Sequence, residues 1–177
     1  RAGAHDNLED RRAFSAVVCG QMPQRAFGEV RGIGRIVAVE RDGRAHDQSR
    51  RVARRLLEER ALQKRLKGRR LALLAHPASV TKSLAHSMDA LFAAGLALVA
   101  AFGPQHGLRG DKQDNMVESP DFTDPVHAIP VFSLYGEVRR PSDAMMQSFD
   151  VLLVDLQDLG CRIYTFVTTL AYVLEAA

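Results

Sequence analysis

From Leu71 to the end of the chain, short apolar runs alternate with helical patterns, and this alternation constrains the possible folds more than any other feature. The apolar runs that predict strands span residues 71–75, 96–102, 129–136 and 150–158. They are apolar on both faces, which is typical of strands that are covered on both sides. Helical patterns separate them, and strands joined through helices form parallel sheets. The sequence therefore predicts an α/β fold, a Rossmann-like three-layer sandwich with a mostly parallel sheet.

The predicted helices have recognisable limits. The first spans residues 81–95, with Thr81 as the expected N-cap and Gly95 as the stop. A short helix begins at Pro141, and a long apolar helix begins near Cys161. Because this last pattern runs to Ala177 without a stop signal, the chain is expected to be a fragment.

Upstream of residue 71 the pattern is weaker. Residues 52–66 have the spacing of an amphipathic helix with a basic outer face. Residues 1–51 contain two isolated apolar pieces, "AFSAVVC" and "GRIVAVE", and either could be a strand, but no connected pattern joins them. We therefore expect residues 1–51 to be a basic, poorly patterned leader, disordered or non-native, and residues 52–177 to be a truncated Rossmann-like domain.

Charge divides the chain at the same place. Residues 1–70 hold 18 Lys and Arg against 9 Asp and Glu, whereas residues 71–177 hold 6 against 12. A basic segment can bind nucleic acid through phosphates. Here the arginines follow no helical stripe and no aromatic residues are interleaved for base stacking, so a nucleic-acid partner is disfavoured.

Other classes of protein are disfavoured by what the sequence lacks. The longest apolar run, residues 90–102, is too short for the roughly 20 residues that cross a bilayer, so no membrane partner is expected. Cys19 and Cys161 are far apart in unlike contexts and predict neither a disulfide framework nor a zinc site. No signal peptide is visible, which favours the cytoplasm, although a start at Arg1 would hide one.

Polar residues gather after all four predicted strands. The stretches "HPAS", "GPQHGLRGD", "SLYGEVRRP" and "DLQDLGCRIY" follow the strands in order. Ligands of parallel α/β sheets bind outside the carboxyl ends of the strands, so we expect these residues to line one crevice. The candidates are His76, Gln105, His106, Arg109, Tyr135, Asp155, Gln157, Asp158, Arg162 and Tyr164.

Several candidates have two interpretations. His76 either closes a turn or takes part in function, whereas His106, in a glycine-rich loop, favours function as a group that orients a hydroxyl or exchanges a proton. Asp155 and Asp158 suit acid/base chemistry, a metal or the binding of sugar hydroxyls, but Asp155 could instead bind loop amides. Arg162 either pairs with Asp158 or receives a substrate carboxylate.

The four stretches together are familiar. "LALLAHPASVT", "LVAAFGPQHGLRGD", "IPVFSLYGEVRRP" and "FDVLLVDLQDLGCRIYTFVTTLAYVLEAA" resemble the bacterial exo-β-N-acetylmuramidase family of the NamZ type, formerly a domain of unknown function, over about residues 52–177. The resemblance implies a Rossmann-like amino-terminal domain whose cleft is completed by a second α/β domain, absent from this chain. It also implies hydrolysis of the non-reducing terminal N-acetylmuramic acid of peptidoglycan fragments, with no required metal or nucleotide cofactor.

The chain departs from the family at one position. The family stretch resembles F-x-P-E-H-G, and Gln105 stands where the family has its candidate catalytic glutamate. A neutral amide cannot exchange a proton as an acid or base. Asp111, Glu118, Asp155 and Asp158 are nearby carboxylates that could replace it.

The resemblance leads to a division of roles and to two readings of function. It favours Asp158, Asp155, Gln105 and His106 as catalytic residues, and His76, Arg109, Tyr135, Gln157, Arg162 and Tyr164 as residues that bind a muramic-acid-containing saccharide. A glycoside hydrolase of the peptidoglycan-recycling kind is the favoured function. A non-catalytic binder of cell-wall sugars is the alternative, because of Gln105.

Overall fold

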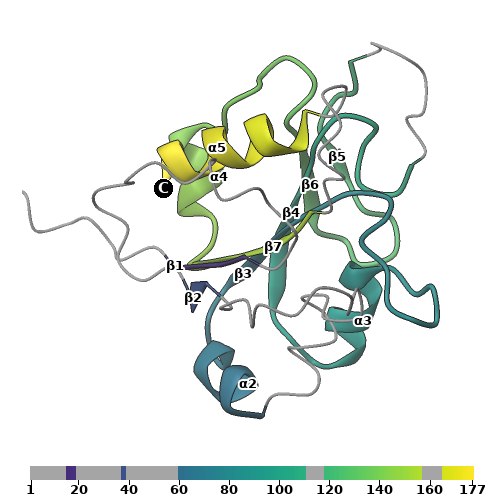
Figure 1. Ribbon diagram of the computed structural model, residues 1–177, viewed down its shortest axis with the longest axis vertical. Coiled ribbons are helices and arrows are strands. Elements are labelled where there is room, and N and C mark those ends of the chain that lie inside the picture. Colours follow the sequence, from purple (N-terminus) through teal and green to yellow (C-terminus); the bar gives the residue numbers. More distant parts are fainter. Residues whose placement is uncertain (1–14, 19–36, 39–59, 111–117, 157–164) are drawn as a thin grey trace, which may run out of the picture.

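The computed structural model describes residues 15–18, 37–38, 60–110, 118–156 and 165–177, and these form a mostly parallel sheet with helices on both faces (Figure 1). The strand order is β2-β1-β7-β3-β4-β6-β5. Only β5, which pairs with β6, is antiparallel among these strands. The strands are β1 Ser15–Val18, β2 Val37–Ala38, β3 Leu71–Ala75, β4 Leu98–Gly103, β5 Phe122–Thr123, β6 Pro130–Ser133 and β7 Val151–Asp155.

In the described ranges, two pairs of helices cover the sheet. α2 (Arg60–Leu66) and α3 (Ser87–Ala93) lie on one face, and α4 (Asp143–Gln147) and α5 (Phe166–Ala176) lie on the other (Figure 1). Successive residues of a strand point to opposite faces. Leu73 accordingly packs in the core beneath α2 and α3, while its neighbour Leu74 packs beneath α4 and α5. The predicted α/β three-layer sandwich is confirmed.

The helix predicted at 81–95 is shorter than expected. It begins at Ser87, and its N-cap is His86 instead of Thr81. Thr81 belongs to a separate turn, in which its N–H donates to the carbonyl of Ala85 and its carbonyl accepts from the N–H of Leu84. The predicted stop is confirmed, because Gly95 follows the helix with a φ of 73°.

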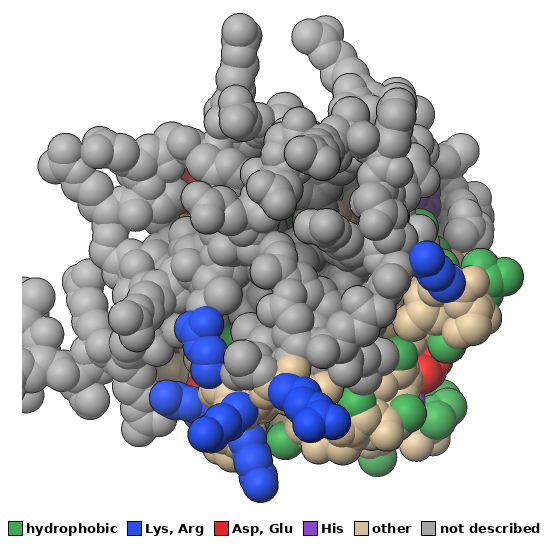
Figure 2. All heavy atoms as spheres, turned by 60° about the horizontal axis from the view of Figure 1, so that its bottom comes forward, with side chains coloured by type: hydrophobic (Ala, Val, Ile, Leu, Met, Phe, Trp, Pro, Cys, Tyr) green, Lys and Arg blue, Asp and Glu red, His purple; other side chains and the backbone are tan. Residues whose placement is uncertain are grey.

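The basic outer face predicted at 52–66 is present on the part of the helix that the structure describes. Leu66 is buried, whereas Arg60, Lys64 and Arg65 are exposed, and Lys and Arg side chains gather over this surface (Figure 2). No helix among the described residues is long and apolar enough to cross a membrane.

The two isolated apolar pieces of the first 51 residues both contribute strands. Val17 of β1 lies opposite Leu153 of β7 and also opposite Val37 of β2. The sheet therefore extends into the segment expected to precede the domain. Most of residues 1–51 lies outside the described part of the chain, so the division at residue 52 stays a prediction.

Candidate functional site at the carboxyl edge of the sheet

The strand register brings the predicted loops to one edge of the sheet. Ala75 at the end of β3 lies opposite Asp155 at the end of β7, and Gly103 at the end of β4 lies opposite Ser133 at the end of β6. The strand order reverses between β3 and β7: the chain goes from β3 outward to β4, and later returns to β7 on the other side of β3. Ligands of such sheets bind at this kind of switch point.

His76 lies at the switch point with its imidazole fixed from one side. It is 2 % exposed, and both its backbone N–H and its Nδ1 lie 3.0 Å from the hydroxyl oxygen of Ser79. The Ser79 hydroxyl donates its single proton to the carbonyl of Asp155. Nδ1 of His76 must therefore carry a proton and donate it to Ser79, since the hydroxyl has none left to give. The ring of Phe166 packs against the same imidazole in a T-shaped arrangement, with the ring centres 4.8 Å apart.

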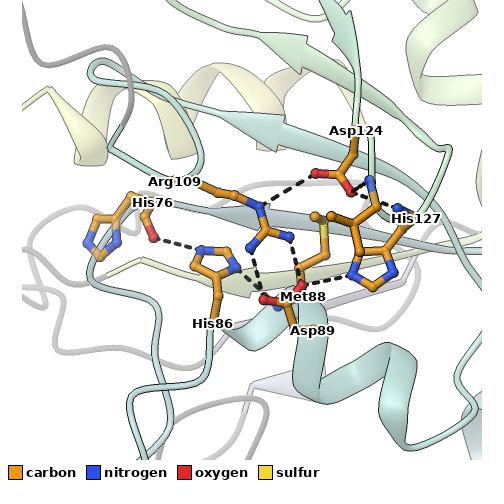
Figure 3. Close-up of polar contacts among 8 residues, drawn as sticks. His76, His86, Met88, Asp89, Arg109, Asp124 and His127 are labelled. Carbon is orange, nitrogen blue, oxygen red and sulfur yellow. Dashed lines mark hydrogen bonds and ion pairs between the residues drawn. The ribbon is translucent and has the colours of Figure 1, made fainter.

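His86 is held neutral in the opposite tautomer. Its Nε2 donates to the carbonyl of His76 at 3.2 Å, and its Nδ1 accepts from the N–H of Met88 at 3.3 Å (Figure 3). Burial lowers the pKa of His86, in agreement with a nitrogen that accepts a hydrogen bond. His86 thus links the end of β3 to the start of α3.

Asp155, a predicted catalytic carboxylate, is 1 % exposed at the end of β7. One of its carboxylate oxygens accepts a hydrogen bond from the hydroxyl of Ser87, the first residue of α3. A buried carboxylate requires such donors to offset its lost hydration. In the described part of the chain, Asp155 therefore ties β7 to α3, whatever further role it has.

The loop after β4 makes a left-handed bend. His106 has a φ of 72° and is followed by Gly107 with a φ of 76°. The N–H of Gly107 closes a turn by donating to the carbonyl of Pro104 at 3.0 Å. A positive φ is uncommon for histidine and costs conformational energy, so surrounding contacts must hold it.

The two side chains of the bend differ in their contacts. The side-chain oxygen of Gln105 accepts a hydrogen bond from the hydroxyl of Thr165 at 3.1 Å, which joins the bend to the residue before α5. The Nδ1 atom of His106 is buried and has no hydrogen-bond partner among the described residues. An unsatisfied buried nitrogen at a strand-end loop is a candidate contact for a ligand.

Arg109, predicted to bind substrate, is engaged by two carboxylates (Figure 3). Its two terminal nitrogens donate to the two oxygens of Asp89 at 2.9 and 2.7 Å, and its Nε lies 3.5 Å from Asp124. The hydrogen bonds from Arg109 hold the pKa of Asp89 well below its usual range, and a further hydrogen bond from His127 acts in the same direction. Asp89 is therefore ionised, and both of its carboxylate oxygens accept hydrogen bonds.

Tyr135 follows β6 and is 7 % exposed. The guanidinium of Arg139 stacks on its ring at 4.0 Å from the ring centre. Arg139 also lies 3.8 Å from Glu118, one of the carboxylates considered as a replacement for Gln105. Glu118 is an exposed residue.

The remaining predicted residues are not described by the structure. Gln157, Asp158, Arg162 and Tyr164 lie in the stretch 157–164, and Asp111 lies in 111–117. Their roles stay predictions. Within the described ranges, no group of three or more His, Cys, Asp and Glu side chains could hold a metal ion.

Sequence reasoning missed the residues that fix the predicted ones in place, namely Ser79, His86, Ser87, Asp89, Asp124 and His127. One signal in the sequence pointed to His86 and Asp89. An acidic residue is favoured in the first turn of a helix, and Asp89 marks a helix start near residue 86 better than Thr81 does.

Comparisons with known proteins identify the family and the relatives of this chain. Residues 71–177 match the model of the family described as exo-beta-N-acetylmuramidase NamZ, N-terminal. Over 115 residues the chain is 44% identical to the peptidoglycan beta-N-acetylmuramidase NamZ of Bacillus subtilis, covering 64% of this chain and 28% of that protein.

Two crystal structures of DUF1343 family proteins from Bacteroides fragilis share the fold. One has a TM-score of 0.60 at 38% identity and covers 72% of this chain and 31% of the other. The second has a TM-score of 0.55 at 29% identity and covers 71% and 30%. The chain thus spans less than a third of the length of these relatives. Since the family model matches more than half of its residues, the chain belongs to the exo-beta-N-acetylmuramidase NamZ family, in the part described as N-terminal.

Proposed function

We propose that this chain is part of a glycoside hydrolase that releases the non-reducing terminal N-acetylmuramic acid from peptidoglycan fragments. The observation that carries the proposal is the family match over residues 71–177, which includes the polar stretches that follow all four predicted strands. The Bacillus subtilis relative is a peptidoglycan beta-N-acetylmuramidase, and this chain spans 28% of its length. We expect the family's second α/β domain to complete the cleft.

The chemistry requires carboxyl groups that the bend itself lacks. Glycoside hydrolysis by the usual route uses one carboxyl group as acid and a second as base or nucleophile. Gln105 can accept and donate hydrogen bonds but cannot exchange a proton in this way. In our proposal Asp155 or Asp158 supplies carboxylate chemistry, and Gln105 and His106 bind sugar hydroxyls.

The remaining candidates bind the sugar in this proposal. The buried Nδ1 of His106, which has no hydrogen-bond partner within the part of the chain that the structure describes, supports a polar ligand at the bend. His76, Tyr135, Gln157 and Tyr164 are assigned to the sugar ring and its substituents. The lactyl carboxylate of muramic acid suits a two-pronged contact with arginine, and Arg162 is the candidate because Arg109 already pairs with Asp89 and Asp124.

The test is sugar release by the full gene product from a chromogenic glycoside capped with N-acetylmuramic acid. We expect colour release above the blank and none from the matched glycoside capped with N-acetylglucosamine. The absence of release from both substrates would exclude the hydrolase function.

A non-catalytic binder of cell-wall sugars is the second candidate, and Gln105 is the observation that favours it. An amide in place of a glutamate preserves shape and hydrogen bonding while removing acid/base chemistry. Calorimetry that detects binding of N-acetylmuramic acid in the absence of hydrolysis would support this function over the first.

A further inference from the structure

We propose that Arg109 is a positioning residue that holds the Gln105–His106 bend in place, with its guanidinium committed to Asp89 and Asp124 and not to a substrate carboxylate. The kinetic consequence of this inference rests on the proposed hydrolase function. Its structural consequence does not, because the conformation of the bend can be measured without turnover.

The bend needs an external hold. His106 and Gly107 both have positive φ, and a non-glycine residue in this conformation costs about 1–3 kcal/mol unless the surroundings enforce it. The contacts that stabilise the bend come from Leu108 and Arg109, the two residues that follow Gly107. Leu108 is 1 % exposed in the core beneath α3, and Arg109, the next residue, turns its side chain to α3 itself.

Arg109 joins three segments that are distant in the sequence. Its fork contacts both oxygens of Asp89 in the first turn of α3, and its Nε contacts Asp124 in the turn between β5 and β6. A two-pronged contact fixes orientation as well as distance, which a single hydrogen bond does not. The loop after β4 is thereby held against α3 and the β5–β6 turn at the same time.

Both carboxylates depend on further contacts in the same cluster. Asp124 is 2 % exposed and accepts from the N–H groups of Val126 and His127 at 3.2 and 2.8 Å, which shapes the turn. The imidazole of His127 lies 2.7 Å from Asp89 (Figure 3). The same ring stacks on Phe92, with the ring centres 3.9 Å apart. Asp89 and Phe92 are three residues apart, so they present one face of α3 to the turn.

A substrate carboxylate would have to displace these partners. Withdrawing Arg109 would leave the buried carboxylate of Asp124 without its cation, and removing one partner of a buried charge pair is costly. The contacts therefore favour a permanent structural role, and they leave recognition of the lactyl group to another cation.

The test compares Arg109→Gln, Asp89→Asn and the double variant in the full gene product. The first readout is the imidazole NMR signal of His106. This chain has six histidines, so the signal is assigned as the one that disappears in His106→Gln. The second is the split between kcat and KM on the muramic-acid-capped glycoside. Arg109→Lys is the milder variant in case the others fold poorly, because it keeps the charge and loses the fork.

The matched control is Arg70→Gln. The Nε and one terminal nitrogen of Arg70 donate to Asp150 at 3.2 and 2.7 Å. The side chains of Arg70 and Asp150 are 43 and 29 % exposed, which is similar to the 32 and 39 % of Arg109 and Asp89. Arg70 and Asp150 precede β3 and β7, so this pair lies at the opposite edge of the sheet. Its loss should leave the His106 signal unchanged.

A positioning role predicts that Asp89→Asn and Arg109→Gln shift the His106 signal alike, and that the double variant adds little. In the kinetics, kcat should fall about 10- to 100-fold in both single variants with little change in KM, since small displacements of reacting groups have effects of this size. Arg109→Lys should shift the His106 signal in the same direction by a smaller amount.

A substrate-binding role predicts a different pattern. Asp89→Asn would leave the His106 signal in place, while Arg109→Gln would raise KM and leave kcat unchanged. That result would overturn the proposal. If the unmodified protein releases no sugar, the hydrolase function fails, and the His106 signal still decides the role of Arg109.

Discussion

Replacing Gln105 with glutamate tests the chemistry of the left-handed bend most directly. The substitution keeps the size and shape of the side chain and exchanges an amide nitrogen for an oxygen. The oxygen of Gln105 accepts a hydrogen bond from the hydroxyl of Thr165 at 3.1 Å, and a carboxylate can accept the same bond. We therefore expect Gln105→Glu to fold normally, with the free energy of unfolding within about 0.5 kcal/mol of the parent.

The expected gain in activity is large. A positioned general acid or base contributes roughly 10²- to 10⁴-fold to a rate. With about 1.36 kcal/mol for each factor of ten, this gain corresponds to about 2.7–5.4 kcal/mol of transition-state stabilisation. The hydrogen bond from Thr165 orients the carboxylate, and hydrogen bonds to charged groups are worth about 1.5–3 kcal/mol. Part of the gain should therefore depend on Thr165.

The assay is release of the chromogenic group from the muramic-acid-capped glycoside, measured as kcat for the parent, Gln105→Glu and Gln105→Glu with Thr165→Val. We expect the first substitution to raise kcat by two orders of magnitude or more, and the second to remove part of that increase. Gln147→Glu is the control, because Gln147 is an exposed residue of α4 and the change in charge is the same.

The result that would refute this reasoning is a folded Gln105→Glu protein with the same rate as the parent. Such a protein would show that both carboxyl groups of the reaction are already supplied by other residues, or that the bend does not face the scissile bond. A similar gain from Gln147→Glu would refute it as well, because the effect would then arise from net charge.

Three further predictions concern stability. Phe102→Ala should destabilise the fold by about 3–5 kcal/mol in urea unfolding, since Phe102 is fully buried, whereas Phe122→Ala at an exposed edge should have little effect. Gly136→Ala should cost about 1–3 kcal/mol in the same measurement, because an added Cβ would collide with the backbone carbonyl of Ser119, which cannot rotate away. The pKa of Asp89 is lowered in the folded protein by its arginine partner, so its contribution is present above the unfolded-state pKa near 4 and is lost as the pH falls. The stability difference between the parent and Asp89→Asn should therefore shrink from pH 7 towards pH 2, and a difference that stays constant or grows would contradict this assignment.

The sequence by itself determined the class of fold and the edge of the sheet that carries the polar loops. Strands buried on both faces must be apolar at successive positions, and β3 and β7 are read directly from their composition. Parallel strands end at the same edge, so the loops after them had to meet. The glycines of "FGPQHGLRGD" likewise predicted a tight bend. The structure has this bend at His106 and Gly107, both of which have positive φ.

Only the tertiary structure decided which polar groups pair. His86 caps α3 because the carbonyl of His76 is within its reach, and no local rule ranks histidine above Thr81 as a cap. Arg109 finds Asp89 twenty residues before it, and Asp124 fifteen residues after it, among many carboxylates that the sequence offers equally. A local pattern records which residues can be buried or capped, because those effects act over a few neighbouring positions. Ion pairs between distant segments depend on the path of the whole chain, so they become visible only once the sheet and its helices are in place.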